Sequence, residues 1–291
     1  MVHYLSRMEL EEISHWSTCS ISNGIELFNI RPRNEGFMLP EIKCMFPDLG
    51  PMFGYAVTAV ISADSPGGRR IEPAEWWEEI LKIPEPRIAV IHDLDRPVIG
   101  SFWGEVNASI HKALGCVGAV TDGSVRDLDE VRKAGFHFFS SCVSVSHAYV
   151  HLVEVGLPVK VGGLTVKPGD LIFGDQHGVL SIPHEIAKEV SLAAKLVEDW
   201  ERPVIDYCKS THSTPRSDPS TSLRTGARGM LRVDTERRFS LDSARDGELV
   251  EPLPRFKNRG LAPSNVSKSF SIEGLKERYL SPRPIWPPRN G

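Results

Sequence analysis

Three carboxylates and one arginine, Glu105, Asp127, Glu130 and Arg126, stand at fixed spacing between Gly104 and Glu130. Glu105 is separated from Arg126 by twenty residues, and Asp127 follows directly. Glu130 lies one helical turn beyond Asp127, so both carboxylates can face one side of a helix start. Hard oxygen ligands of this kind suit Mg²⁺ or Mn²⁺, which keep several waters and need only one or two protein carboxylates. The stretch therefore predicts a divalent-metal site.

The same stretch offers groups that could hold an organic acid. Arg126 stays charged at any working pH and can grip a carboxylate through two parallel N–H groups. A helix start at 104–107 would present unpaired backbone N–H groups and a positive dipole end to an anion. Together these groups predict a site for a 2-oxo acid and for the enolate formed when a bond breaks. A solvated helix face with local ion pairs is the alternative interpretation.

Short elements must position these residues. Segments rich in β-branched residues predict strands at 54–62, 86–94, 116–123, 136–144 and, divided by turns, 158–183. Helical spacing predicts helices at 105–115, 126–135 and 184–202. Strands and helices do not alternate regularly in this pattern, which favours an α/β sandwich over a doubly wound sheet.

The helix expected at 105–115 carries the first acid of the site. Its apolar positions Val106, Ile110 and Ala113 or Leu114 share one face, which we expect to be buried. Gly115 suits the C-terminal cap.

Charge divides the chain into two regions. The 291 residues include 41% hydrophobic and 25% charged residues, enough for a sizeable core. Residues 208–291 hold 16 Lys and Arg against 9 Asp and Glu, whereas residues 1–207 have a net charge of −11. We predict a folded domain over 1–207 and a low-complexity basic tail over 208–291, disordered except for a short helix at 272–280. Nucleic-acid binding by this tail is disfavoured against a solvated extension.

Several function classes lack their sequence signals. The chain has no G-x-G-x-x-G after a strand, no P-loop and no G-x-S-x-G elbow. The five cysteines are scattered without a C-x-x-C pair, which is typical of reduced thiols. No run of about 18 apolar residues predicts a membrane span, and the first residues lack a signal-peptide pattern. The expected location is the cytoplasm.

The pattern around Asp127 resembles the RraA-like family, which includes the 4-hydroxy-4-methyl-2-oxoglutarate aldolases. That family is marked by an acid, a twenty-residue gap, Arg-Asp and another acid after two residues, and Glu105, Arg126 and Asp127 fit this frame. Glu130 supplies the last acid. The segments GPMFGYAVTA, GCVGAVTDGSVRD and GGLTVKPGDLIFGDQHGVLSIP are similar to further family segments in the same order. The resemblance covers roughly residues 15–205 and implies a β/β/α sandwich with flanking helices.

The resemblance also implies a role for each site residue. Asp127 would bind the divalent metal directly, and Glu105 would act through metal-bound water. Arg126 would hold the pyruvyl carboxylate and the enolate. The backbone of Val106 and Asn107 would complete the carboxylate seat.

The activity implied is that of a class II pyruvate aldolase. It would cleave 4-hydroxy-2-oxo acids to pyruvate and decarboxylate oxaloacetate through the same enolate. The family assembles as homotrimers or homohexamers with the site between subunits, where a neighbour can add an acid. Glu198 and Glu201 are both open candidates for that acid. The family often has Asp at the position of Glu105, and the tail has no recognised counterpart.

Two other interpretations remain open at this point. Some family members are non-catalytic regulators that bind ribonuclease E; that branch can lack the aspartate after the arginine, so Asp127 favours an enzyme. A lyase or transferase with a larger substrate would use Ser144, His147 or Tyr149. His177 could reach the cleft, while Asp122 is interpreted as a turn residue.

Overall fold

A computed structural model describes residues 4–209. The predicted tail beyond 209, including the helix at 272–280, lies outside the described residues. The chain divides into two compact units, Met1–Glu198 and Asp199–Gly291. The boundary after residue 207 therefore stays a prediction, because one helix runs from the first unit into the second.

The described residues form short helices and a larger number of strands. The helices are α1 (Arg7–Ser14), α2 (Thr18–Phe28), the short 3-10 helix η1 (Pro47–Leu49), α3 (Pro73–Leu81), α4 (Glu105–Ala113), α5 (Leu128–Lys133) and α6 (Val190–Lys209). The strands are β1 (Lys43–Cys44), β2 (Met52–Ser62), β3 (Arg87–Asp93), β4 (Ser101–Trp103), β5 (Cys116–Val125), β6 (His137–Val143), β7 (His151–Val155), β8 (Val159–Val161), β9 (Leu164–Val166), β10 (Leu171–Asp175) and β11 (Gly178–Ile182).

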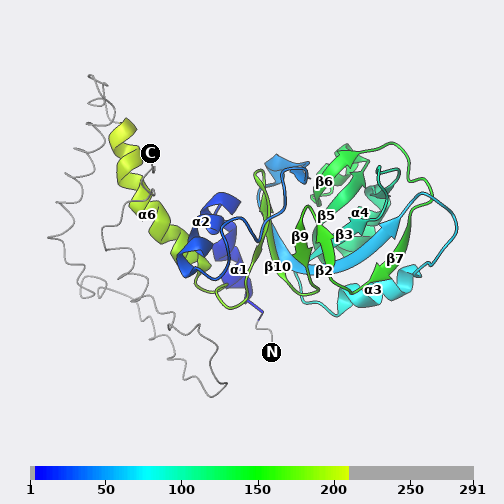
Figure 1. Ribbon diagram of the computed structural model, residues 1–291, viewed down its shortest axis with the longest axis horizontal. Coiled ribbons are helices and arrows are strands. Elements are labelled where there is room, and N and C mark those ends of the chain that lie inside the picture. The colour runs from blue at the N-terminus through cyan, green and yellow to red at the C-terminus, as the bar shows by residue number, and fades with distance from the viewer. Residues whose placement is uncertain (1–3, 210–291) are drawn as a thin grey trace, which may run out of the picture. The chain divides into compact units, whose positions relative to one another are not determined.

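Parallel strands form the centre of the main sheet. Its order is β1-β6-β5-β3-β2-β10-β11, with β4 paired to β5 and β7 paired to β2. Strands β2, β3, β5 and β6 are mutually parallel, and α3, α4 and α5 connect them (Figure 1). The chain thus alternates strand and helix from β2 to β6 more regularly than the sequence pattern predicted.

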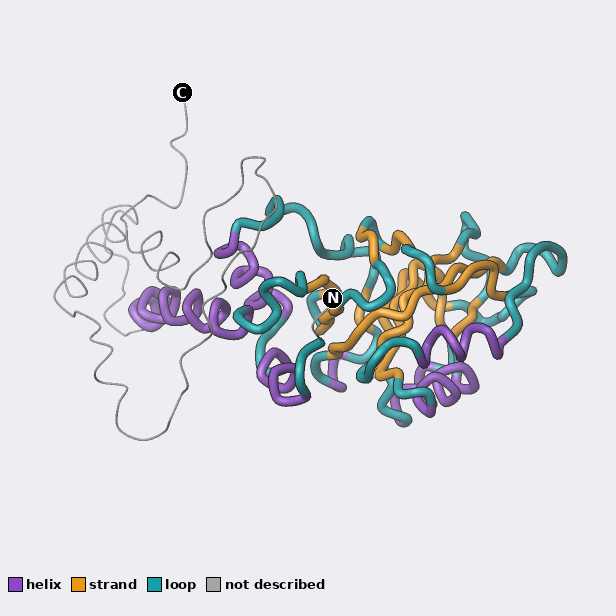
Figure 2. The backbone as a smooth tube through the Cα atoms, turned by 90° about the horizontal axis from the view of Figure 1, so that it is seen from below, coloured by secondary structure: helices purple, strands orange, loops and turns teal. Residues whose placement is uncertain are grey.

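The sheet separates two cores, as its period-two side-chain pattern requires. On one face, alternate residues of β2 and β3 pack with Trp76 of α3, Ala108 of α4 and Val131 of α5. On the other face, the remaining residues pack under the β8–β9 hairpin, with Val161 and Val166 buried. In the right half of Figure 2, helices lie along the lower side of the strands. This arrangement confirms the predicted β/β/α sandwich, because these helices cover one face only.

Two predictions about helices need correction. The buried residues of α4 are Ala108 and His111, whereas Val106 is 72% exposed. The helix expected from residue 184 begins at Val190, because turns occupy the preceding residues. The C-terminal cap of α4 is as predicted, since Gly115 has a φ of +77°.

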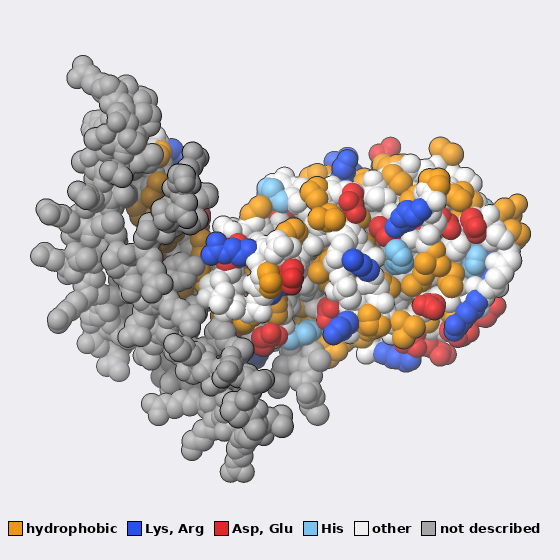
Figure 3. Space-filling view, viewed as in Figure 1, with side chains coloured by type: hydrophobic (Ala, Val, Ile, Leu, Met, Phe, Trp, Pro, Cys, Tyr) orange, Lys and Arg blue, Asp and Glu red, His pale blue; other side chains and the backbone are white. Residues whose placement is uncertain are grey.

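Neither positive nor negative charge dominates the face drawn in Figure 3. Acidic and basic side chains are interspersed with apolar ones over this face of the described residues (Figure 3). Among residues 4–209, no helix is both long and apolar enough to cross a membrane.

Candidate functional site

The predicted site residues meet where β4 and β5 leave the sheet. These two strands are parallel, with Trp103 opposite Val125, so both end at the same edge. The backbone N–H of Arg126 donates to the carbonyl of Trp103 at 3.0 Å, which fixes the two strand ends together. Residues that follow β4 therefore lie beside residues that follow β5, although about twenty positions separate them in sequence.

Asp127 is held against the start of α4. Its φ of 55° places it in the left-handed region, which aspartate tolerates better than most residues. Oδ2 accepts the backbone N–H of Glu105 at 3.0 Å and lies 3.7 Å from Nε of Arg126. A Cβ at Gly104 would come within 2.5 Å of that oxygen, so only glycine leaves the carboxylate this place.

The first turn of α4 offers an anion seat. The helix begins after Gly104 without a side-chain cap, and Asp127 takes the N–H of Glu105. The next two N–H groups, of Val106 and Asn107, find no acceptor within residues 4–209. The side chain of Arg126 is 34% exposed beside them, so an arriving carboxylate would meet two amides and a guanidinium.

The donor set fits a weakly held divalent cation. Oδ1 of Asp127 accepts no hydrogen bond from the described residues and is therefore available as a ligand. Residues 4–209 contain no group of three or more His, Cys, Asp and Glu side chains placed to hold a metal. The described residues could thus offer one or two carboxylates, which would be enough only for a cation that keeps several of its waters.

The structure brings together Gly104, Glu105, Arg126 and Asp127 but not every predicted residue. Glu130 is exposed on α5, and no contact within the described chain joins it to either of the other acids. Its proposed part in metal binding is untested.

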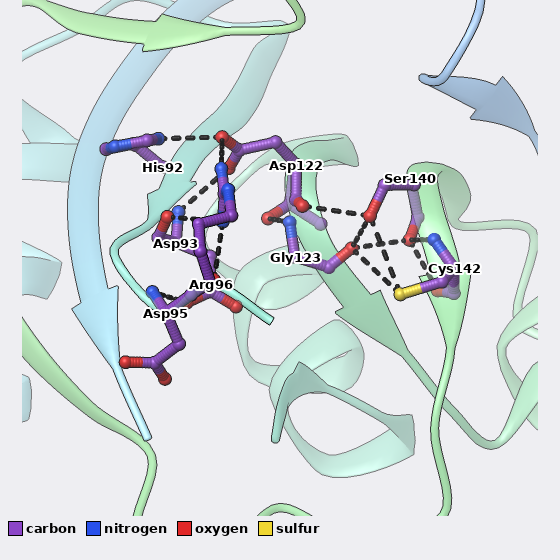
Figure 4. Close-up of polar contacts among 10 residues, drawn as sticks. His92, Asp93, Asp95, Arg96, Asp122, Gly123, Ser140 and Cys142 are labelled. Atoms are coloured by element: carbon purple, nitrogen blue, oxygen red, sulfur yellow. Dashed lines mark hydrogen bonds and ion pairs between the residues drawn. The ribbon is translucent and has the colours of Figure 1, made fainter. Parts of the chain in front are cut away.

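A second polar cluster, which we call the Asp122 cluster, was not found from the sequence. It comprises His92, Asp93, Asp95, Arg96 and Asp122, at the carboxyl ends of β3 and β5 (Figure 4). The carboxylate of Asp122 accepts from His92 Nδ1 at 2.8 Å and from Arg96 Nη2 at 2.6 Å. Its other oxygen accepts the backbone N–H of Asp93 at 2.8 Å. Asp122 is therefore a strand residue that closes the cluster, and its interpretation as a turn residue is wrong.

Within the Asp122 cluster, Asp93 is the carboxyl whose pKa is raised most clearly. Its side chain is fully buried, with Oδ1 accepting the N–H of Asp95 at 2.9 Å and Oδ2 without a partner in the described residues. Desolvation, with the nearby charges of Asp95 and Asp122, raises the pKa of this carboxyl to about 6. The sequence signal was present in IHDLDRP, where charges follow a buried strand.

A cavity of about 310 Å³ lies between α2 and the β10–β11 hairpin and includes His177 in its lining. Nδ1 of His177 lies 3.1 Å from Oδ1 of Asp175, which also accepts the hydroxyl of Thr18 at 2.6 Å. Since β10 runs antiparallel to β2 and ends beside Met52, this turn lies at the sheet edge opposite to Asp127. Within one chain, His177 therefore does not join the Arg126–Asp127 site.

Comparison with known proteins links this arrangement to a family. The family model described as "RraA-like: Aldolase/RraA" matches residues 18–181. "Protein DlpA" of Legionella pneumophila is 29% identical over 125 residues, covering 41% of this chain and 20% of the relative. A protein of Halalkalibacterium halodurans named "Putative 4-hydroxy-4-methyl-2-oxoglutarate aldolase" is 31% identical over 104 residues, covering 35% of this chain and 48% of the relative. The chain thus spans half or less of the length of these curated relatives.

Solved structures share the fold. An uncharacterised protein from Pseudomonas syringae pv. tomato has a TM-score of 0.58 at 26% identity, over 72% of this chain and 93% of its own. Streptomyces coelicolor RraAS2, described as an unusual member of the RNase ES inhibitor RraA protein family, has a TM-score of 0.55 at 20% identity. That match covers 69% of this chain and 96% of the other.

Proposed function

The chain belongs to the RraA-like family, and we propose that it is a divalent-metal-dependent lyase that cleaves 4-hydroxy-2-oxo acids to pyruvate. One observation carries this proposal: an exposed carboxylate, a guanidinium and two free amides converge at the start of α4. The relative named as an aldolase supports the reaction class. We further propose oxaloacetate decarboxylation at the same site.

Each residue has a separate task in this proposal. Arg126 and the amides of Val106 and Asn107 bind the carboxylate of the 2-oxo acid. Asp127 and, through water, Glu105 would hold Mg²⁺ or Mn²⁺. When bound, that cation supplies Lewis-acid polarisation of the substrate oxygens.

The chemistry requires one carbon–carbon bond to break. The C4 hydroxyl gives its proton to a base and its oxygen becomes the carbonyl of the leaving fragment. The C3–C4 bond breaks, and the electron pair of that bond passes into the pyruvate enolate, which then takes a proton at C3. In oxaloacetate the same bond breaks with loss of CO₂, so both substrates produce one enolate. In this proposal Arg126 would stabilise the negative charge that develops on the enolate.

We propose a homotrimer or homohexamer as the working assembly. Large apolar side chains stand exposed near the site edge, including Val106 at 72% and Val145 at 96%. Contact between subunits would cover such side chains, and Glu198 or Glu201 of a neighbour could then supply a further acid. Light scattering would measure the assembly directly.

Pyruvate release from oxaloacetate tests the proposal. The full-length protein is assayed with Mg²⁺, with Mn²⁺ and with EDTA. We expect turnover with metal that EDTA abolishes and added metal restores, followed by activity on hydroxylated 2-oxo diacids. An absence of turnover with either metal, on folded and oligomeric protein, would overturn the proposal. A pull-down with a ribonuclease E scaffold segment would then test the regulator function instead.

A further inference from the structure

His111 is a buried polar residue that the proposed chemistry does not use. It lies in the second turn of α4, beyond Glu105, and is 1% exposed. The rings of Trp76, Phe102 and Trp103 surround it, the nearest being Trp103 with its centroid at 4.6 Å. An imidazole in such surroundings must satisfy both ring nitrogens or lose free energy.

The two hydrogen bonds of His111 fix its tautomer. Nε1 of Trp76 lies 2.8 Å from Nε2 of His111, and an indole N–H can only donate. Nε2 is therefore the acceptor and the ring proton lies on Nδ1. That N–H donates to the backbone carbonyl of Asn107 at 2.6 Å.

Asn107 connects this ring to the proposed site. Its amide Nδ2 donates to the carbonyl of Phe102 in β4 at 2.5 Å, while its backbone N–H is one of the two free amides of the anion seat. The first turn of α4 has no N-cap side chain of its own. Besides the backbone bonds of the helix, such as Ala108 N–H to the Gly104 carbonyl at 2.9 Å, side chains make three contacts to this turn. They are Asp127 to the N–H of Glu105, Asn107 to β4, and His111 to the carbonyl of Asn107.

We infer that His111 is a positioning residue, which holds the first turn of α4 in register with Arg126 and Asp127 by tying the Asn107 carbonyl to Trp76 of α3. This inference rests on the proposed function for its consequence in catalysis. Within the described residues, His111 contacts the carbonyl of Asn107 but none of the groups proposed to bind the substrate, so its effect would reach the substrate through the amides of Val106 and Asn107.

The protonation state of His111 suits this role. Burial lowers its pKa to about 4, so the ring stays neutral across the range in which an enzyme works. A neutral ring keeps Nε2 as an acceptor for Trp76, whereas an imidazolium would place two donors against each other. A change in proton occupancy would therefore break the link, and burial prevents that change.

Three variants of the full-length protein test the inference. His111→Phe keeps an aromatic ring but loses both hydrogen bonds. His111→Asn places an N–H where Nδ1 stood and so retains a donor to the Asn107 carbonyl, although it leaves a cavity and the Trp76 N–H unpaired. Val90→Ala destabilises the core on the opposite face of the sheet and controls for lost stability.

The readouts are amide hydrogen exchange of residues 104–113 and the KM and kcat for oxaloacetate. For His111→Phe we expect exchange at the hydrogen-bonded amides of Glu105 and Ala108 to rise about tenfold and KM to rise about tenfold, with a smaller change in kcat. His111→Asn should return both toward the wild-type values despite its lower Tm. Val90→Ala should lower Tm without changing either readout.

Two results would overturn the inference. One is equal behaviour of the Phe and Asn variants, and the other is a KM or exchange change in Val90→Ala that matches its loss of Tm. Wild-type protein without turnover would count against the proposed function alone, because the exchange comparison still decides whether His111 holds the turn.

Discussion

Two aspartates of the β5 region, Asp122 and Asp127, behave differently although they lie close together in the sequence. Asp122 is 10% exposed in its side chain and accepts hydrogen bonds from His92, Arg96 and the Asp93 backbone. Asp127 is 37% exposed and accepts one, from the Glu105 backbone. The oxygens of Asp122 are occupied by hydrogen bonds within the fold, whereas Asp127 can still accept further hydrogen bonds from a ligand or bind one.

The contrast between these aspartates shows why charge density alone is a poor guide to function. The Asp122 cluster has more ionisable groups and a pKa raised to about 6 at Asp93, yet its hydrogen bonds run largely among its own members, and the one atom left without a partner in the described residues, Oδ2 of Asp93, is buried away from any ligand. The Arg126–Asp127 pair has fewer groups, but these face solvent next to free amides. Spare hydrogen-bonding capacity distinguishes the two regions better than the number of charges.

The largest expected effect comes from exchanging the two aspartates for asparagine separately. Asn tolerates the left-handed backbone of Asp127, so Asp127→Asn should fold normally. It should lower kcat/KM for oxaloacetate and for a hydroxylated 2-oxo acid together, by about 10³-fold, because both pass through one enolate. Steady-state kinetics with both substrates measures this.

The matched control is Asp122→Asn, which makes the same aspartate-to-asparagine substitution in the Asp122 cluster. It should retain metal-dependent turnover but lose about 2 kcal/mol of unfolding free energy, since Arg96 and His92 lose a charged partner. Loss of only one activity in Asp127→Asn, or equal kinetics in the two variants, would contradict the division of roles.

A smaller effect is expected from Asp93→Asn within the Asp122 cluster. Burial raises the pKa of Asp93 above its unfolded value of 3.8 to about 6, so the folded state favours the proton. Protonation of Asp93 therefore stabilises the folded state fully below about pH 4, and this contribution to the unfolding free energy is lost as pH rises through about 6. The amide cannot ionise, so the variant should gain about 2 kcal/mol at pH 8 relative to wild type and little at pH 4. Urea unfolding of both proteins between pH 4 and pH 8 measures this difference. The same pH dependence of unfolding free energy in the variant and in wild type would contradict the raised pKa of Asp93.

The smallest effect is expected from Glu105→Asp. The shorter side chain withdraws the carboxylate by about 1.5 Å. Because Glu105 is proposed to act through water, turnover should stay within about tenfold of wild type. Glu105→Gln, which keeps the length and removes the charge, should lose more. A greater loss of turnover in Glu105→Asp than in Glu105→Gln would show that the length of this side chain matters more than its charge.

The sequence predicted the proximity of Glu105, Arg126 and Asp127 better than it predicted what surrounds them, and their roles stay a prediction. Glu105, Arg126 and Asp127 were found together because parallel strand ends carry them to one edge, and the strand patterns were clear. Asp122 was predicted to lie in a turn because Asp-Gly is a common turn sequence. In the structure, the register between β5 and β6 shifts between Thr121 and Ser124, and Asp122 and Gly123 stay within β5. A local sequence pattern cannot reveal this pairing between strands.

The buried face of α4 shows a second limit. Apolar periodicity selected Val106, yet the core takes His111 because Trp76 offers it a hydrogen-bond donor. That partner lies 35 residues away and on another helix, so no local pattern could identify it.

Gly104 has a consequence for how this protein can change over generations. Its backbone is extended, with φ of −154°, so another residue could adopt its conformation and the chain would still fold. Yet every amino acid reachable from a glycine codon by one nucleotide change brings a Cβ, which would displace the Asp127 carboxylate. Under the proposed function, a substitution at Gly104 would give descendants that fold but have lost activity, a route by which an enzyme lineage can give rise to binding proteins.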